Sequence, residues 1–382
     1  MSNDGVFRAS RLLLIVVLAV ALTACGSQPS NEPAPATPAP STEAPSGEAP
    51  APAEPAVEYH PFTYQGADRE QKLVEGAKQE GKVTWYTSLA GPVVNAMVAA
   101  FQEKYPDIKV DVFRGDQSKV ISLIGTEAQA NKHVADVLEI TSDGALLLRE
   151  QGLLAPFFSP VAIDRPEQYR VDADNGLVWE ATDRVSYISF AYNKNQLPAE
   201  SVPQTIQDLL KPELKDKIAV VSSTTGIRFI GGVLALLGEE EGKKFLEEFS
   251  KQNIRVESVS GAALMGLIAQ GEVAASTTIF QNHTQQEAGK GAPVDWLPVG
   301  PVIANAGDVV AMKTAPNPHA AMLFVDFILG AEGAKVLNEL EYSTPNDQVD
   351  YEFWLPESDF ESSKDYQAAY DGWKQLFDET FR

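Results

Sequence analysis

The chain has 382 residues, 44% of them hydrophobic, and a formal charge of −23, so it is long enough for two lobes with sizeable cores. Its acidity and its lack of any Lys/Arg cluster exclude nucleic acid as a partner, because a phosphate backbone requires a basic face. The single cysteine, Cys25, excludes a disulfide framework and a cysteine-based zinc or iron–sulfur site.

Residues 1–24 have the pattern of an export signal. Arg8 and Arg11 precede an apolar run over 12–22, which is shorter than the roughly 20 residues that span a bilayer. The run ends in Leu22-Thr23-Ala24-Cys25, which resembles the bacterial lipobox, in which the peptide is cut before a lipid-bearing cysteine. We therefore expect a lipid on Cys25, with the protein exported and either anchored to the outer face of the cytoplasmic membrane or in the periplasm. A buried core cysteine is the alternative.

Residues 25–57 consist almost entirely of Pro, Ala, Ser, Thr, Glu and Gly. Such a stretch has nothing to bury against a core, so its ordering entropy is not offset, and the prolines favour extended segments. The composition predicts a disordered tether between the lipid and a globular part. Lipid, tether and globular part together indicate a protein that works at a membrane surface.

The first half of the globular part alternates helix and strand. A helix over 68–81 should end at Gly81. The segments that follow should alternate, with strands over 82–88, 108–113 and 135–141 and helices over 92–105, 118–130 and 144–152. Short β-branched runs between amphipathic segments are typical of a parallel sheet covered by helices on both faces.

The second half begins a new α/β set. We expect strands over 186–194, 217–223, 273–280 and 308–313, and helices over 227–238, 240–253 and 261–271. The segment 205–217 should be helical until its proline, Pro212, and 317–340 should supply two more helices. The fold class is therefore α/β with two lobes, each with a central, mostly parallel sheet flanked by helices. The first lobe should comprise 58–185 plus 305–345, and the second 186–304 plus 346–382.

Three junctions place hydroxyl groups at the end of a strand and the start of a helix. They are Ser88, Thr141-Ser142 and Ser223-Thr224-Thr225. In open α/β sheets the ligand site lies beyond the carboxyl ends of the strands, where helix N-termini favour negative charge. The three junctions therefore suit a small polar or anionic ligand in one shared cleft. Each is also an ordinary N-cap, because Ser and Thr are preferred there.

Four further residues are candidates for contact with a ligand. Asn282 and His283 follow the predicted strand over 273–280, in a segment that we expect to pass from strand to loop. Arg228, just inside a helix, could pair with an anion or lie solvated on its surface. Asp308 could contact a cation or cap a strand. If a metal takes part, His283 and Asp308 are the residues expected to contact it.

The chain resembles family 1 extracellular solute-binding proteins, the class II periplasmic-binding-protein group that includes ferric-iron, phosphonate and thiamine binders. The likeness covers roughly 66–345 and is carried by phrases in a constant order: VTWYTSLAG, ADVLEITSDGALLLREQGLLAPF, SFAYNKNQLP, TIQDLLKPELKDKIAV, GKGAPVDWLPVGPV and APNPHAAMLFVDFILGAEGAKVL. The resemblance implies two lobes joined by hinge strands, which close on a ligand and dock onto a membrane permease.

The resemblance also bears on the ligand. Ferric-iron members use two adjacent tyrosines in the segment that corresponds to 280–285, often with an upstream histidine and an acid, whereas this chain reads FQNHTQ there. Bare Fe³⁺ prefers phenolate and carboxylate oxygen. Hydroxyl, amide and imidazole groups suit a small oxyanion, an organic acid or an already chelated metal better.

The sequence therefore predicts a solute-binding lipoprotein of an ABC importer that acts as a monomer, without a cofactor and without enzymatic activity. Its expected partners are a small-molecule or metal-complex ligand, a membrane permease and, through the lipid, the membrane. GxSxG, GxxxxGK[ST] and HExxH are all missing from the sequence, and these are patterns that many hydrolases, nucleotide-binding enzymes and zinc enzymes carry. A lipid-anchored hydrolase or transferase and a stalked surface adhesin are the alternatives.

Overall fold

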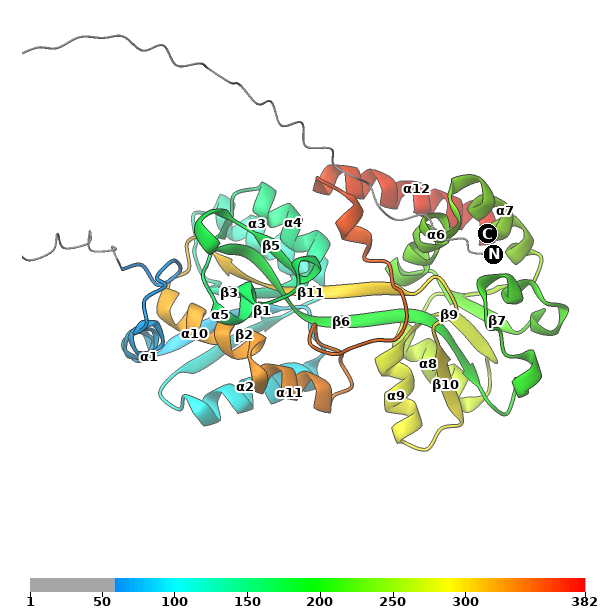
Figure 1. Cartoon of the computed structure of the whole chain (residues 1–382), viewed down its shortest axis with the longest axis horizontal. Coiled ribbons are helices and arrows are strands. Elements are labelled where there is room, and N and C mark those ends of the chain that lie inside the picture. Colours follow the sequence, from blue (N-terminus) through cyan, green and yellow to red (C-terminus); the bar gives the residue numbers. More distant parts are fainter. Residues whose placement is uncertain (1–58, 382) are drawn as a thin grey trace, which may run out of the picture. The chain divides into compact units, whose positions relative to one another are not determined.

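Eleven strands within residues 59–381 join into one hydrogen-bonded sheet, which Figure 1 shows in a computed structural model of the chain. The expected export signal, Cys25 and the tether lie outside these described residues. The strands are β1 (Lys82–Thr87), β2 (Lys109–Arg114), β3 (Val137–Thr141), β4 (Leu154–Ala155), β5 (Arg170–Asp172), β6 (Val178–Asn193), β7 (Ile218–Val221), β8 (Arg255–Glu257), β9 (Ala275–Phe280), β10 (Val294–Leu297) and β11 (Ile303–Met312).

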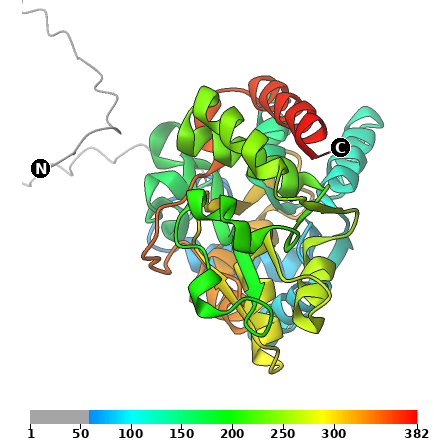
Figure 2. The same ribbon diagram turned by 90° about the vertical axis from the view of Figure 1, so that its right-hand side faces the viewer.

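Helices cover both ends of this sheet. They are α1 (Arg69–Glu80), α2 (Gly91–Lys104), α3 (Gln117–Gln129), α4 (Ser142–Glu150), α5 (Pro160–Ile163), α6 (Thr224–Leu237), α7 (Glu239–Ser250), α8 (Gly261–Gln270), α9 (Gln281–Gly289), α10 (Pro318–Leu329), α11 (Ala331–Glu339) and α12 (Ser363–Phe381). Figure 2 shows α6, α7 and the C-terminal α12 packed together at one end of the molecule. Among residues 59–381, no helix combines the length and the apolar character needed to cross a bilayer.

The strand order is β2-β1-β3-β11-β6-β9-β7-β8. The strands β1, β2 and β3 are parallel to one another and form the first strand set, while β7, β8 and β9 are parallel and form the second. Between them, β11 is antiparallel to β3 and β6, and β6 is antiparallel to β9. The two sets therefore run in opposite directions, and both turn their carboxyl ends toward β6 and β11.

The pairing register measures the distance between the two sets. β3 ends at Thr141, whose partner Gly307 pairs with Arg184, while β9 ends at Phe280, which pairs with Ile188. Ile188 lies four residue steps along β6 from Arg184, and at about 3.3 Å per step the two are about 13 Å apart. Over this length β6 and β11 continue between the strand sets, so that a cleft can form beside them.

Each strand set packs against its own buried side chains. On the first set, Trp85, Phe101 and Phe324 lie in one apolar cluster, with edge-to-face ring centroids 4.8–5.2 Å apart. On the second set, Phe229 and Phe249 belong to a cluster that also contains side chains from α12. Burial of such large aromatic surfaces is the main favourable term in folding, and it holds each set together independently of the cleft.

The expected α/β class is confirmed, and so is the end of the first helix, where Gly81 adopts a left-handed conformation with φ 72°. The segment from Thr205, expected to be helical until its proline, forms a 3-10 helix over Ile206–Leu210 that ends before Pro212. Two other local expectations were wrong. The segment after Phe280 is helix α9 rather than a loop. The strand expected over 186–194 begins eight residues earlier, at Val178.

Candidate functional site

A cavity of about 110 Å³ lies where the carboxyl ends of the two strand sets face each other across β6 and β11. Its walls come from the turn between β1 and α2, from β6 and β11, from the junction of β9 with α9, and from Tyr342 in the segment after α11. We call it the cleft cavity, and its lining residues are Ser88, Leu89, Ala90, Arg184, Ser186, Phe280, Asn282, His283, Asn305 and Tyr342.

Three polar atoms on this cavity have no hydrogen-bond partner among the described residues, although they are buried. They are Oγ of Ser88, Oδ1 of Asn282 and Nδ1 of His283. Leaving a buried polar group unsatisfied costs about 1–3 kcal/mol, and native proteins leave few such groups. Three of them around one cavity are what a site requires when a bound solute supplies the partners.

Ser88 owes its position to the end of β1. Its backbone N–H donates to the carbonyl oxygen of Glu139, at 3.0 Å. The preceding hydroxyl, Oγ1 of Thr87, donates to a Glu139 carboxylate oxygen at 2.7 Å and accepts from the N–H of Leu89 at 3.0 Å. These bonds fix the turn, and they leave the Ser88 hydroxyl to face the cavity at the start of α2.

Asn282 and His283 lie in the first turn of α9. Burial lowers the pKa of His283 from 6.5 to about 4, and its ring lies edge-to-face with Phe280, with centroids 5.2 Å apart. The imidazole is therefore neutral near pH 7 and can donate from one ring nitrogen while it accepts at the other. The N-terminal ends of α2 and α9 both border the cavity, and their dipoles favour a negative group there.

The floor of the cavity contains a buried ion pair. The Nε and Nη2 atoms of Arg184 lie 3.0 and 2.9 Å from Oε1 of Glu139. Burial tends to lower the pKa of Arg184, but the carboxylates of Glu139 and Asp183 outweigh it and raise the pKa. Arg184 thus remains charged, and Glu139 largely neutralises it.

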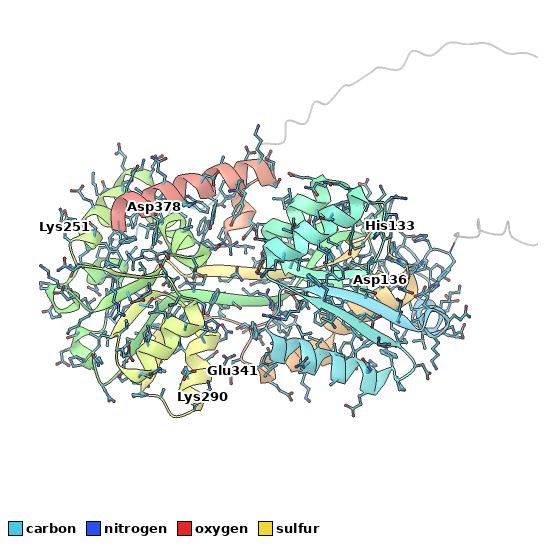
Figure 3. All side chains as sticks on the ribbon, turned by 180° about the vertical axis from the view of Figure 1, so that it is seen from behind. His133, Asp136, Lys251, Lys290, Glu341 and Asp378 are labelled. Atoms are coloured by element: carbon cyan, nitrogen blue, oxygen red, sulfur yellow. The ribbon has the colours of Figure 1, made fainter. Side chains whose placement is uncertain are left out.

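Tyr342 closes the cavity from the segment after α11. Its backbone N–H donates to the carbonyl of Leu337 at 3.0 Å, and the preceding Glu341, labelled in Figure 3, turns the chain with φ 66°. Burial raises the pKa of the Tyr342 phenol. The phenol is therefore protonated and able to donate a hydrogen bond to a solute.

The residues expected to bind ligand are divided among three places. Ser88, Asn282 and His283 line the cleft cavity. Ser142 and Asp308 line a second cavity, where Oδ1 of Asp308 accepts from the hydroxyl of Thr182 at 2.7 Å. The remaining expected residues line neither of these cavities; they are Thr141, Ser223, Thr224, Thr225 and Arg228.

Four of these five residues are engaged elsewhere or solvent-exposed. Oγ1 of Thr141 donates to Asp143 at 2.7 Å. Ser223 and Thr224 are exposed at the start of α6, where Tyr370 donates to the Thr224 hydroxyl at 3.3 Å. Arg228 is buried, and its guanidinium binds Glu357, Asn305, Tyr366 and, at 3.5 Å, Asp143.

Sequence reasoning missed the cavity residues in the middle of strands, namely Arg184, Ser186 and Asn305, together with Tyr342. The available signal was a run of polar residues, 182–186 apart from Val185, inside a strand that is buried along nearly its whole length. Polar side chains in such a strand need partners or a cavity.

The His, Asp and Glu side chains around the two cavities do not support a metal centre. Within residues 59–381, no group of three or more His, Cys, Asp or Glu side chains is placed to hold a metal ion. His283 and Asp308 line different cavities. His133, labelled in Figure 3, lies in the exposed turn before β3, at the opposite end of that strand from the cleft.

Two parallel strand sets that point toward one cavity across two connecting strands define a solute-binding protein of the periplasmic type. The comparisons agree. Residues 83–339 match the model of the bacterial extracellular solute-binding protein family, and the chain belongs to this family. Proteins of this family bind solutes outside the cytoplasm rather than transform them.

Relatives and solved structures extend the comparison. The Iron uptake protein A1 of Synechocystis sp. is 24% identical over 305 residues, which cover 73% of this chain and 80% of the relative. An uncharacterized protein of Haemophilus influenzae is 26% identical over 268 residues, or 68% of this chain and 76% of that protein. The periplasmic binding protein AfuA from Actinobacillus pleuropneumoniae superposes with a TM-score of 0.63 at 22% identity, over 78% of this chain and 99% of AfuA. HitA from Pseudomonas aeruginosa superposes with a TM-score of 0.60 at 20% identity, over 76% of this chain and 99% of HitA.

Proposed function

We propose that this protein is the solute-binding component of an ABC-type importer, which holds a small solute in the cleft cavity and delivers it to a membrane permease. The observation that carries the proposal is the group of three buried, unpartnered polar atoms on Ser88, Asn282 and His283. These atoms come from both strand sets, so a solute that bonds to all of them bridges the cleft.

The solute is a small organic anion, such as a phosphate ester or a carboxylate, or a metal already chelated by one. Two helix N-termini favour negative charge at the cavity, and the protonated Tyr342 phenol adds a donor. The AfuA structure contains fructose-6-phosphate, and a Trichodesmium protein of the same fold was solved with iron and citrate. HitA was solved with iron bound, but a bare ferric ion, which prefers phenolate and carboxylate oxygen, would find one phenol, Tyr342, and no carboxylate on the lining of the cleft cavity.

Closure of two lobes on the solute supplies the transport signal. The first lobe comprises 58–185 plus 305–345 and the second 186–304 plus 346–382. Separate buried clusters on the two strand sets support this division, and β6 and β11 are the only long strands, within residues 59–381, that pass from one to the other. A solute that contacts both lobes favours the closed state by its differential contacts, and the permease then recognises that state.

The protein acts outside the cytoplasm as a monomeric lipoprotein without a cofactor or a catalytic step. The lipobox-like sequence that ends at Cys25, followed by the tether over 25–57, supports attachment to the outer face of the cytoplasmic membrane or retention in the periplasm. Membership of a family of binding proteins supports a role without catalysis.

Solute-induced stabilisation tests this function. Thermal unfolding would be followed against a panel of sugar phosphates, carboxylates and ferric citrate. A ligand at a hundredfold its Kd should stabilise the protein by about 2.7 kcal/mol. In a variant with Ser88, Asn282 and His283 all changed to Ala, that stabilisation should disappear while the far-UV spectrum stays native.

The matched control is Ser223→Ala, because Ser223 is exposed at a similar strand-to-helix junction but does not line the cavity. This variant should respond to the solute as the wild type does. An unchanged response of the triple variant would show that the solute binds elsewhere. Turnover of the bound solute would identify an enzyme and refute the proposal.

A further inference from the structure

A second cavity, of about 260 Å³, lies beside β6 and β11 and has no lining residue in common with the cleft cavity. Its walls come from α4, β5, β6, β11 and the segment that leads into α12, which passes beside α4 and β11 (Figure 1). We call it the acid cavity, because three buried carboxyl groups line it: Glu180, Asp308 and Glu357.

The three carboxyl groups come from separate parts of the chain, and only 3%, 4% and 9% of Glu180, Asp308 and Glu357 is exposed. Oε1 of Glu357 binds Arg228. Its other oxygen, Oε2, is buried and has no hydrogen-bond partner among the described residues. A buried carboxylate oxygen without a partner is costly, so Glu357 leaves one acceptor atom for a donor that comes from outside the chain.

The charges around the cavity do not balance within residues 59–381. Arg149 pairs with Glu180 at 2.8 Å, and Arg228 pairs with Glu357. Asp308 accepts only from hydroxyl groups and forms no ion pair. The second cation on the lining besides Arg149 is Arg170, which is engaged by Asp172 at 2.7 Å. The cavity therefore carries an excess of negative charge when its carboxyl groups are ionised.

Burial raises the pKa of Glu180 to about 8 and that of Glu357 to about 7, and it also raises the pKa of Asp308. Each shift shows that the buried negative charge is under-compensated, since nearby cations would lower the pKa of a carboxyl group. A cation bound in the cavity would supply the missing compensation.

The apolar residues on the lining of the acid cavity indicate what kind of cation fits there. Leu146, Val171, Leu355 and Phe360 line the cavity beside the carboxyl groups, and an apolar wall suits an alkyl chain rather than a hydrated ion. The acidic groups are not arranged as a metal-binding set anywhere in the described part of the chain. A primary ammonium group carries three N–H donors on one atom, which matches acceptors that converge from three segments.

We propose that the acid cavity binds a small primary alkylammonium ion, with the ammonium group at Glu357 and Asp308 and the alkyl chain against Val171 and Phe360. This site is separate from the cleft cavity, so it stands or falls independently of the solute proposed there.

Calorimetric titration with n-butylamine tests the proposal. The buffer should be at about pH 8.5, above the pKa of about 8 for Glu180 and below that of an alkylammonium group, about 10.4. One n-butylammonium ion should bind per chain, whereas 1-butanol and butyrate should not bind. Glu357→Gln keeps the shape but removes the charge, so it should weaken binding at least about tenfold, as expected for a hydrogen bond to a charged group.

Two further variants keep the test decisive if Glu357→Gln misfolds. Val171→Phe should fill the cavity without altering any charge and should abolish butylamine binding. Asn282→Ala, which alters the cleft cavity, should leave butylamine binding unchanged. The proposal is overturned if butylamine does not bind, if 1-butanol binds equally well, or if Val171→Phe, folded by circular dichroism, binds the amine as the wild type does.

Discussion

His283 provides a quantitative test of the cleft cavity, because its pKa reports how completely the site excludes water. Burial lowers that pKa from 6.5 to about 4, and the position of His283 in the first turn of α9 acts in the same direction. As pH falls below 6.5, the unfolded chain binds a proton at His283, whereas the folded protein binds it only near pH 4. Stability is therefore fully present above 6.5 and is lost between 6.5 and 4.

The size of the loss follows from the two pKa values. Between about pH 7 and about pH 5, this one group should cost the folded state about 2 kcal/mol. The variant His283→Gln cannot titrate, so it should lack this part of the loss. Urea unfolding of both proteins at the two pH values isolates the contribution of His283 to the pH dependence of stability, because every other titrating group is common to both proteins.

The control for this experiment is His133→Gln, since His133 is exposed in the turn before β3. That variant should lose stability with falling pH just as the wild type does. If His283→Gln also follows the wild type to within about 0.5 kcal/mol, then the imidazole is hydrated in solution. The cavity would then be open to water, and the assignment of its unpartnered atoms to a solute would lose its main support.

Three other substitutions test the packing that builds the site. Arg228→Met leaves Glu357 buried without its cation and should cost about 3 kcal/mol in urea unfolding. Gly226→Ala would place a Cβ 1.8 Å from the carbonyl oxygen of Val221; because that contact is with backbone, a loss of about 3 kcal/mol or more in thermal unfolding is expected. Trp85→Ala removes a fully buried ring and should cost about 3–5 kcal/mol, measured by urea unfolding monitored through circular dichroism; a loss below about 1 kcal/mol would contradict its place in the core.

The parts of the fold that sequence reasoning located correctly are those whose signals are local. The helix that ends at Gly81 is marked by a residue suited to a left-handed turn. The strands β1 and β3 are marked by short β-branched runs, and Ser88 follows the first of them into the cleft cavity. In each case the determining contacts lie within a few positions along the chain.

The parts that it missed depend on partners far away in the chain. The polar segment around Arg184 does not resemble a buried strand until Glu139, 45 positions earlier, is seen to pair with it. Helix α9 carries no apolar periodicity, and it is held instead by contacts with α8 and β10. Likewise, no local feature distinguishes the junction at Ser88, which lines the cleft cavity, from that at Ser223, which does not.

Arg228, which was expected to bind ligand, instead makes a contact between the two strand sets. Its guanidinium, on α6 of the second strand set, lies 3.5 Å from Asp143 on α4 of the first, so this contact crosses the cleft. At 3.5 Å this is the longest of the contacts that the Arg228 guanidinium makes, and a quarter of the Asp143 side chain is exposed to solvent. In the lobe closure proposed for this protein, the contact with Asp143 breaks when the lobes separate, while the bond from Arg228 to Glu357 keeps the guanidinium paired. Under that proposal, the solute must favour the closed state by its own differential contacts with the two lobes, because the contact between Arg228 and Asp143 adds little to them.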